Sequence, residues 1–391
     1  MTYQKSIFLL FYIFSHLFCS GQIYEPGTTY SGTNDYVRYQ AGNLPLIISV
    51  PHGGAQKPAS IPDRSCSGCV VINDSYTMEL GIAVKEAIYD LTGCYAHLVI
   101  NDLHRSKMDA NRDIVEAARG NEEAEKAWKE YHAFLDSANL AAIREWDRGL
   151  VIDLHGHGHD IQRLEIGYRI SSSELRMTDS ELDNSDISDE SSIRTLVDSS
   201  SLSLSEIIRG NSSLGDLLHV RGFDAVPSSY IPDPASGEPY FQGGYITDRY
   251  GSKSGDETDA IQIECNRDVR FDQTERNRFA DTLGVQLINF LQIHYFADLP
   301  NSYCISTNAN HTEKVEEFRI HPNPSCYQIK LSRNFLSGEI QIFNSIGKKI
   351  YTRTIAGDLL NLPGLNNGLY FVRFQDLKGR VAVEKLIVQC Q

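Results

Sequence analysis

Short apolar runs alternate with long helical patterns between residues 22 and 298. The runs have the length of buried strands and cover residues 46–50, 97–100, 150–154 and 260–263. Apolar residues elsewhere in this region recur at three- and four-residue spacing, which predicts helices at about 75–91, 121–146 and 274–296. This alternation is typical of an α/β domain in which helices cross over a sheet.

Two further segments differ in composition. Residues 171–200 are rich in Ser and acidic residues, yet their apolar residues recur at helical spacing, so we expect short helices capped by Ser and Asp. Residues 299–317 carry few apolar residues and are predicted to be a linker.

The periodicity changes to two near the C-terminus. Apolar and polar residues alternate at 328–331, 339–343, 369–374 and 381–386. Turns that contain glycine separate these segments. The pattern predicts a small all-β sandwich over residues 318–391.

Residues 1–21 have the features of a signal peptide. Lys5 is their only charged residue, an apolar stretch follows it, and small residues at 19–21 provide a cleavage site. We therefore expect export, with no transmembrane segment in the mature chain. The mature chain would keep seven cysteines, which leaves at least one thiol free, and Cys66 and Cys69 are predicted to form a local disulfide.

Charge is distributed unevenly along the chain. The net charge is −15, but residues 318–391 carry +6 and residues 22–317 carry −22. So acidic a body would repel a phosphate backbone, which argues against nucleic acid as a partner.

Polar residues follow each of the four predicted strands of the body. His52 comes after the first strand and Arg105 after the second, while His155 and Glu264 stand at the ends of the third and fourth. In open α/β sheets, ligands bind beyond the carboxyl ends of the strands. We therefore expect these four side chains to share one site.

Imidazole and carboxylate groups at such a site suit zinc, and a catalytic zinc ion takes three protein ligands. We predict His52 and His155 as two ligands and Asp74 as the third. Asp74 has a competing role as the N-cap of the helix expected at 75–91, and Glu79 is the alternative carboxylate ligand.

Glu264 lies on an otherwise apolar strand, where an ionised carboxylate is costly unless it is paired or used. We predict a general base at this position, with an ion pair to Arg267 or Arg270 as the alternative. Hydrogen-bond donors for an oxyanion and a substrate carboxylate are expected from Arg105, Asn111 and Arg112. Their alternative role is in salt bridges with Asp102, Asp109 or Asp113.

The C-terminal segment carries four motifs of a known kind of domain. They are His-Pro-Asn-Pro at 321–324, Ile-Gln-Ile-Phe-Asn-Ser-Ile-Gly at 340–347, Asn-Gly-Leu-Tyr-Phe-Val at 367–372 and Lys-Leu-Ile-Val at 385–388. This segment resembles the type A C-terminal sorting domain of type IX secretion. The resemblance implies that the type IX secretion machinery recognises residues 318–391 and delivers the chain through the periplasm to the cell surface or the medium.

The body carries a second set of motifs. They are Val-Pro-His-Gly-Gly at 50–54, Leu-His-Arg at 103–105, Asp-Ala-Asn-Arg at 109–112, Glu-Tyr-His at 130–132, Asp-Leu-His-Gly-His at 153–157 and Ile-Gln-Ile-Glu at 261–264. Together they resemble the N-formylglutamate amidohydrolase family, which shares its fold with the zinc carboxypeptidases and aspartoacylases. The resemblance implies a three-layer zinc-hydrolase domain with a mixed sheet over residues 22–298.

The same resemblance implies roles for single residues. These are zinc ligands at His52, Asp74 and His155, oxyanion support at Arg105, carboxylate binding at Asn111 and Arg112, and a general base at Glu264. Carboxypeptidases have a Glu three residues after the first zinc histidine, where this chain has Ala55. Tyr245 and Arg249 are candidates for further contacts with the substrate.

These observations predict an exported zinc-dependent amidohydrolase. Its substrate would be an N-acyl amino acid or a peptide with a free carboxylate. A metallocarboxypeptidase is the alternative among enzymes. A catalytically inactive module that binds peptides or glycans on the same fold is the alternative from another class.

Overall fold

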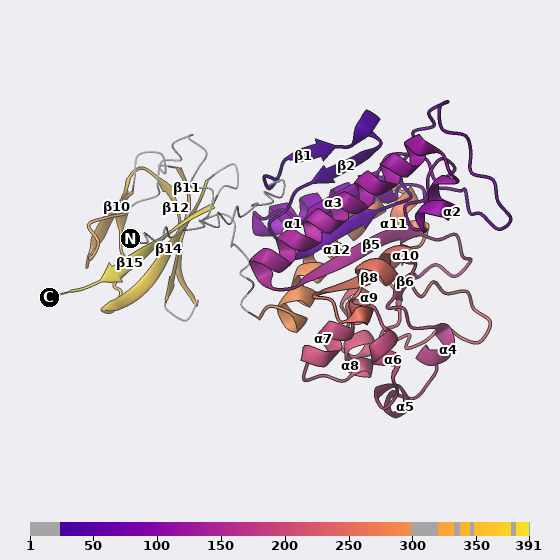
Figure 1. Ribbon diagram of the computed structural model, residues 1–391. Coiled ribbons are helices and arrows are strands. Elements are labelled where there is room, and N and C mark those ends of the chain that lie inside the picture. The colour runs from indigo at the N-terminus through magenta and orange to yellow at the C-terminus, as the bar shows by residue number, and fades with distance from the viewer. Residues whose placement is uncertain are drawn as a thin grey trace, which may run out of the picture. The chain divides into compact units, whose positions relative to one another are not determined.

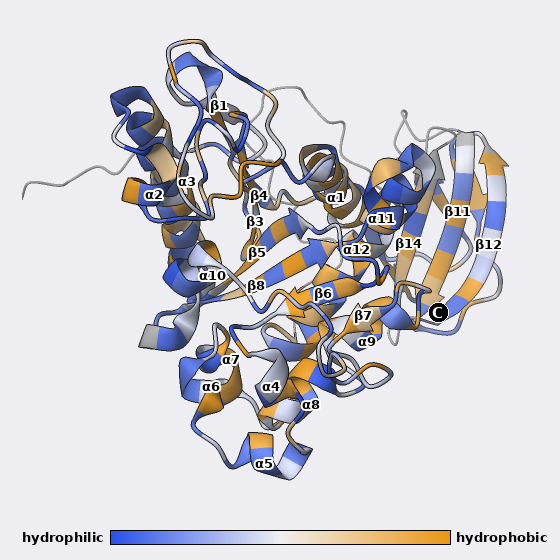
Figure 2. Cartoon of the chain, turned by 90° about the vertical axis from the view of Figure 1, so that its right-hand side faces the viewer, coloured by the Kyte–Doolittle hydropathy of each residue, from blue (hydrophilic) through white to orange (hydrophobic). Residues whose placement is uncertain are grey.

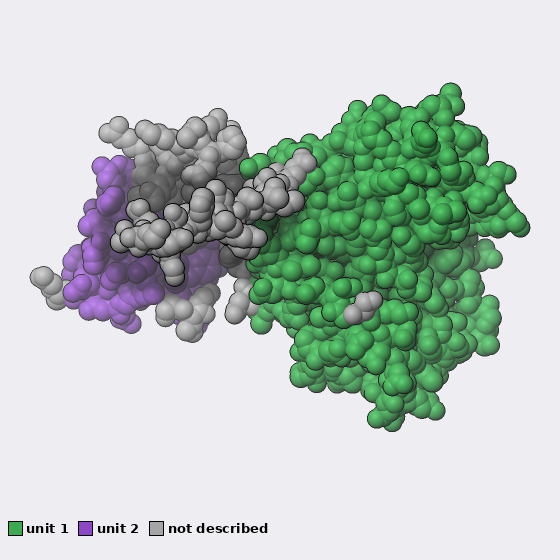
Figure 3. Space-filling model, in the orientation of Figure 1, with its two compact units in different colours: residues 1–308 green, residues 309–391 purple. Residues whose placement is uncertain are grey.

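The computed structural model describes residues 24–297, Leu299, and residues 320–331, 337–344, 348–376 and 381–390. The chain forms two compact units, residues 1–308 and residues 309–391 (Figure 3). The predicted signal peptide at 1–21 and the predicted linker at 299–317, apart from Leu299, lie outside the described residues.

The first unit is built on a mixed sheet of eight strands (Figure 1). Their spatial order is β1 (Thr29–Ser31), β2 (Val37–Gln40), β4 (His97–Asn101), β3 (Leu46–Val50), β5 (Gly149–Gly156), β8 (Thr258–Cys265), β6 (Leu164–Gly167) and β7 (Ala225–Val226). The four central strands β4, β3, β5 and β8 run parallel, and β2 and β6 flank them antiparallel. The four strands predicted from apolar runs are these central strands, so the α/β prediction is confirmed.

Helices cover both faces of this sheet. On one face α1 (Thr77–Thr92) packs against α12 (Gln273–His294), and α3 (Glu122–Trp146) lies on the other. The alternation along β3 separates two buried clusters, since Leu46 and Ile48 belong to the cluster of α1 and α12 whereas Ile47 belongs to that of α3. The predicted three layers are therefore present, and all three predicted helices begin and end close to the expected residues.

A series of short helices follows β6. They are α4 (Ser172–Leu175), α5 (Asp179–Asp183), α6 (Ile187–Glu190), α7 (Arg194–Ser199), α8 (Leu204–Arg209) and α9 (Leu214–His219). Short helices were predicted here, but their N-caps are Ser and Thr: Ser171, Thr178, Ser203 and Ser213 each accept a backbone N–H. The expected Asp caps are absent from this segment, because Asp186 before α6 accepts no such bond.

The other helical elements of the unit are short. They are α2 (Ile114–Ala118), α10 (Tyr245–Tyr250), α11 (Asp268–Phe271) and the 3₁₀ turns η1 (Thr33–Asp35) and η2 (Ser252–Ser254). No helix among the described residues is long and apolar enough to cross a membrane.

The second unit is a β-sandwich. One sheet has the order β13 (Leu359–Asn361), β10 (Gln328–Leu331) and β9 (Ile320–His321), and the other β12 (Lys349–Ala356), β11 (Ser337–Asn344), β14 (Gly368–Asp376) and β15 (Val381–Val388). Hydropathy alternates along the strands of the larger sheet (Figure 2), and Ile329, Ile340 and Val372 from the two sheets share one buried cluster. The predicted sandwich and its four predicted strands are confirmed, while β9 and β13 are too short to give a periodic signal and β12 was missed.

Disulfides join Cys66 to Cys69 and Cys326 to Cys390. The first confirms the predicted local bridge. Cys265 on β8 is a free and buried thiol.

Candidate active site

A cavity of about 470 Å³ opens at the carboxyl ends of the central parallel strands. It is lined by residues that follow or end β3, β4, β5 and β8, among them His52, Arg105, His155 and Glu264. The four side chains therefore line one cavity, as expected. The reason is that neighbouring parallel strands end at the same edge of the sheet.

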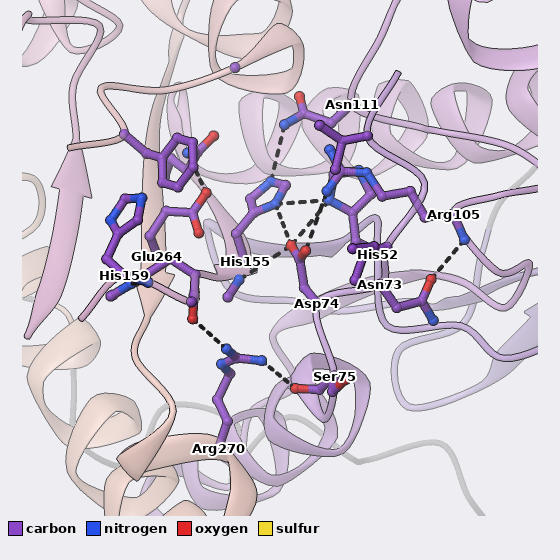
Figure 4. A pocket seen from close by; sticks show the side chains of 18 of the residues that line it. His52, Asn73, Asp74, Ser75, Arg105, Asn111, His155, His159, Glu264 and Arg270 are labelled. Atoms are coloured by element: carbon purple, nitrogen blue, oxygen red, sulfur yellow. Dashed lines mark hydrogen bonds and ion pairs between the residues drawn. The ribbon is translucent and has the colours of Figure 1, made fainter. Parts of the chain in front are cut away.

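Three potential metal ligands form a nearly equilateral triangle at the floor of this cavity (Figure 4). His52 Nδ1 lies 3.1 Å from Asp74 Oδ2 and 3.1 Å from His155 Nδ1, and His155 Nδ1 lies 3.1 Å from Asp74 Oδ2. All three side chains are buried. We call this group the ligand triangle.

Buried carboxylates hold both imidazoles in place from behind. His52 Nε2 donates to Asp109 Oδ1 at 2.6 Å, and His155 Nε2 donates to Asp153 Oδ2 at 2.7 Å. Ser49 Oγ donates to the other oxygen of Asp153 at 2.9 Å. Because each Nε2 atom is engaged, each Nδ1 atom faces the triangle, which is the arrangement usual for metal-ligating histidines.

The third corner of the triangle is Asp74 and not Glu79. The side chain of Asp74 points to the two imidazoles, and only its backbone oxygen takes part in the start of α1, where it accepts from Thr77 N and Thr77 Oγ1. Tyr76 precedes α1 without a side-chain cap, so Asp74 is not the N-cap that was considered as its competing role. Glu79 is an exposed residue of α1 and does not line the cavity.

Four carboxyl groups are buried at the site. They belong to Asp74, Asp109, Asp153 and Glu264, and among the described residues only the guanidinium groups of Arg64 and Arg105 form ion pairs with them. Burial alone would raise the pKa of Asp74, but the imidazoles of His52 and His155 hold it well below 3.8. Burial would lower the pKa of His155, yet Asp153 and Asp74 raise it well above 6.5.

Glu264 stands beside the triangle on β8. Its Oε1 accepts from Gln262 Nε2 at 3.0 Å. Burial, with the nearby carboxylates of Asp74 and Glu165, raises the pKa of Glu264 to about 8, against a smaller opposing effect of His155.

The alternative ion pair of Glu264 is not formed. Arg270 instead donates to backbone oxygens of Cys265, His157 and Ser75, and a Cβ at Gly156 would collide with its guanidinium. Arg267 lines the cavity and forms no ion pair with a carboxylate of the described part of the chain. Glu264 is therefore a buried acid without a guanidinium partner.

Arg105 and Asn111 lie on the other side of the cavity. Arg105 Nε donates to Asp109 Oδ2 at 3.0 Å and its Nη1 to Asp74 Oδ1 at 3.4 Å, so the salt bridge with Asp109 considered from the sequence exists inside the site. The amide nitrogen of Asn111 lies 3.2 Å from His155 Nε2, and its Oδ1 accepts from Ile246 N.

Arg112 is partly exposed at the cavity wall. Its Nε donates to Glu116 at 3.0 Å, so its ion pair is with Glu116 and not with one of the three aspartates considered. Its Nη1 donates to the backbone oxygen of Asn111.

Tyr245 and Arg249 do not line the cavity. Both belong to α10, which begins just after the glycines at 243–244 that do line it, and Arg249 is directed towards α3. There it pairs with Asp136 at 3.3 Å and lies over the ring of Trp128. The backbone before α10 reaches the cavity, but the side chains of these two residues are used in packing.

Sequence reasoning considered Asp109 only as a salt-bridge partner of the arginines and gave no role in the site to Asp153 or Phe241. The spacing of two residues on one strand places Asp153 on the same side as His155, which was the available signal for it. Asp109 lies in the connection after β4, where no periodicity indicates direction.

A second group of possible ligands adjoins the same cavity, which two of its three members, the histidines, line. It consists of His157, His159 and Glu165. His157 Nε2 donates to Arg163 O at 2.8 Å while its Nδ1 accepts from His159 N at 3.1 Å, and His159 Nδ1 donates to Glu165 Oε1 at 2.7 Å. Both ring nitrogens of His157 are thus occupied by the backbone, so this group does not fit a metal.

Comparison with known families identifies the tail. Residues 319–389 match the family described as the secretion system C-terminal sorting domain, which confirms the resemblance of the second unit. No curated protein matches the chain.

Solved structures similar to the body include N-formylglutamate amidohydrolase from Ralstonia eutropha, with 15% identity, a TM-score of 0.40, and coverage of 68% of this chain and 97% of that one. Succinylglutamate desuccinylase from Chromobacterium violaceum has 12% identity and a TM-score of 0.30, and covers 87% of this chain and 95% of that one. PorZ, a surface component of the type IX secretion system of Porphyromonas gingivalis, has 13% identity and a TM-score of 0.18, and covers 21% of this chain and 13% of that one. Because these scores are low, the role of the site rests on its own geometry.

Proposed function

We propose that the body of this chain is a zinc-dependent amidohydrolase that cleaves the amide bond of an N-acyl amino acid or of a peptide with a free carboxylate. The observation that carries the proposal is the ligand triangle, with its imidazoles held from behind by aspartates and a buried glutamate beside it. A structural role alone would not require so much negative charge around two histidines.

The donor set suits zinc. Two imidazole nitrogens and one carboxylate oxygen are ligands of catalytic zinc sites, and ligand atoms at about 2.0–2.1 Å from a tetrahedral ion stand roughly 3.3 Å from one another. The three separations of 3.1 Å are close to that spacing. A divalent cation would also balance the excess of carboxylates over guanidinium groups.

A zinc ion held by His52, Asp74 and His155 would supply Lewis acidity that polarises the substrate carbonyl and favours deprotonation of water. Glu264 would take the proton of the attacking water and deliver it to the leaving nitrogen. A pKa of about 8 lies close enough to neutral pH for Glu264 to exist in the ionised form that accepts this proton and in the protonated form that releases it.

The donors opposite Glu264 would orient the substrate. Arg105, held between Asp74 and Asp109, would stabilise negative charge that develops on the carbonyl oxygen. Asn111 and Arg112 at the same wall would bind the carboxylate of the amino acid.

The alternatives use the same residues. A metallocarboxypeptidase would differ only in accepting a peptidyl group in place of a simple acyl group. An inactive binding module would have no need of Glu264 as an acid without a guanidinium partner, and this observation favours catalysis.

The test uses the full mature chain. We expect about one zinc ion per chain and release of amino acid from a panel of N-acyl amino acids and short peptides. Glu264→Gln should lower turnover by a factor on the order of 10²–10⁴ while zinc is retained. Glu275→Gln, which changes an exposed glutamate of α12 outside the cavity, is the matched control.

Protein that contains no zinc and hydrolyses no member of the panel would contradict the proposal. A zinc-loaded protein with equal turnover in Glu264→Gln would remove the assigned base.

We propose that the type IX secretion machinery recognises the second unit and carries the body through the periplasm to the cell surface or the medium. The match of residues 319–389 to the sorting domain supports this route. Deletion of residues 319–391 should leave hydrolytic activity in the periplasmic fraction and remove it from the medium and the cell surface. Fractionation of a host that has this machinery checks the outcome, and normal delivery of the shortened chain would contradict it.

A further inference from the structure

Four apolar side chains at the cavity are exposed to solvent. Val70, Ile72, Phe241 and Phe271 line it and are 45%, 76%, 44% and 50% exposed. Single exposed apolar residues are common on proteins, but a group around one cavity is typical of a surface that binds an apolar ligand. We call these four residues the apolar rim.

The segment that carries Val70 and Ile72 is fixed to the site on both sides. Arg64 Nη1 donates to Val70 O at 3.2 Å and to Arg105 O at 3.0 Å. Asn73 accepts from Arg105 N at 2.8 Å and donates to Gly54 O. The exposure of Ile72 is therefore imposed by a backbone that is tied to the loops of Arg105 and His52.

A disulfide also restrains the segment of Val70 and Ile72 on its N-terminal side. The disulfide between Cys66 and Cys69 closes the turn just before Val70. A loose loop would bury such side chains against the body, so the arrangement keeps them at the cavity.

Separate elements hold the two phenylalanines. Phe241 N donates to Glu165 Oε2 at 2.8 Å, and its ring stacks on that of His159 at 4.8 Å with an interplanar angle of 14°. The ring of Phe271, in α11, meets that of Tyr76 edge to face at 5.2 Å. The rim thus comes from three segments that the fold brings to one cavity.

Part of the apolar rim lies across the ligand triangle from the candidate carboxylate donor Asn111. In Figure 4, Asn111 lies on one side of His155 and Asp74, while Ser75 and Arg270 lie on the opposite side. Phe271 follows Arg270 directly and therefore belongs to the side opposite Asn111. Phe241 stacks on His159, and Ile72 precedes Asn73, which lies beside Arg105. An amide with its amino-acid carboxylate at Asn111 would direct its acyl group towards the rim.

We propose that the acyl group of the substrate is an apolar chain or ring of about four carbons or more, and that the apolar rim binds it. This inference rests on the proposed function and names its substrate class. An acidic acyl group such as succinyl is the competing possibility, because Arg267 also lines the cavity. The four apolar contacts favour a hydrocarbon.

Binding to Glu264→Gln protein tests the rim without turnover. The probes are the N-acetyl, N-hexanoyl and N-succinyl derivatives of alanine and of glutamate, titrated by calorimetry into the zinc-loaded full chain. Each methylene removed from water improves affinity by about fourfold, so four more methylenes, partly buried, should make the hexanoyl compounds bind on the order of 10- to 100-fold more tightly than the acetyl compounds. The succinyl compounds should bind no more tightly than the acetyl compounds.

Variants locate the contact. Ile72→Ser and Phe241→Ala should each remove about three- to tenfold of the hexanoyl advantage and leave acetyl binding within about twofold. Leu140→Ser is the matched control, because Leu140 is 67% exposed on α3 and does not line the cavity. It should change neither affinity.

Equal affinity for hexanoyl and acetyl compounds, tighter binding of succinyl compounds, or no binding of any probe would overturn the inference. So would an unchanged hexanoyl advantage in both rim variants. Tight binding of hexanoyl compounds that the wild-type, zinc-loaded protein does not hydrolyse would support the rim and contradict the proposed function, so the two failures are distinguishable.

Discussion

Two groups of histidine and carboxylate side chains lie at one cavity, yet only one of them is arranged to hold a metal. In the ligand triangle, Asp109 and Asp153 occupy the outer nitrogens of His52 and His155 and leave the inner nitrogens facing Asp74. In the second group, backbone atoms occupy both nitrogens of His157. Both groups consist of two histidines and one carboxylate, and they differ in which ring nitrogens are available.

The number of nearby carboxylates also differs between the two groups. Several carboxylates surround His155 and raise its pKa well above 6.5 in spite of burial. Burial lowers the pKa of His157, and the single carboxylate of Glu165 does not compensate for it. A site that holds a proton this strongly when metal is absent is one that favours a cation.

The largest expected difference between the groups is in metal content. His155→Ala should reduce zinc from about one ion per chain to none and lower hydrolysis by a factor on the order of 10³ or more. His157→Gln should keep the zinc, because both ring nitrogens of His157 form hydrogen bonds with backbone atoms and neither is available to a metal ion. Metal analysis of the purified, dialysed proteins measures both.

The comparison would fail if zinc remained stoichiometric in His155→Ala. Loss of zinc from His157→Gln alone would mean that the second group, and not the ligand triangle, holds the metal. Circular dichroism of both variants shows whether each is folded when its metal is measured.

The strand-end residues could be predicted because their positions follow from a strong signal. His52, His155 and Glu264 adjoin apolar runs that are legible in the sequence, and parallel strands deliver their carboxyl ends to one edge. The sandwich of the second unit followed from period two for the same reason.

Residues in connections could not be placed in this way. Asp109 contacts His52 because of the path of the loop after β4, which the sequence does not indicate. Arg249 follows the cavity-lining residues 243–244 by only a few positions, but its side chain is directed towards Asp136. The direction of the His157 side chain could not be predicted from the alternation of faces along a strand, because β5 ends at Gly156.

A smaller effect is expected from the carboxylates behind the triangle. Asp153→Asn keeps the shape of the group but weakens the acceptor of His155 Nε2, so zinc affinity should fall by about 10–100-fold. Glu165→Gln, the equivalent change behind His159, should leave zinc affinity within about twofold. Competition with a chromophoric chelator measures both, and equal losses in the two variants would show that the effect is general charge and not orientation.

The smallest expected effect is on the pH dependence of stability in metal-free protein. A histidine whose pKa is raised in the folded state stabilises the fold below pH 6.5, and His155 loses this contribution as the pH rises through its raised pKa. Glu264 acts in the same direction, since its pKa is raised from 4.5 to about 8 and its ionisation between these values costs stability.

His157 acts in the opposite direction, because its lowered pKa means that stability is lost as the pH falls below 6.5. The buried His97 and His132, whose pKa values are lowered to about 3, act like His157 and are common to wild type and variants, so the comparison is made between them. In the presence of a chelator, the midpoint of thermal unfolding of the wild type relative to His155→Gln should decline by several degrees between pH 5 and pH 8, whereas His157→Gln should lose less stability than the wild type on the acid side of pH 6.5. Scanning calorimetry across this range measures both differences, and a difference between wild type and His155→Gln that does not change from pH 5 to pH 8 would mean that the buried carboxylates do not hold a proton at the triangle.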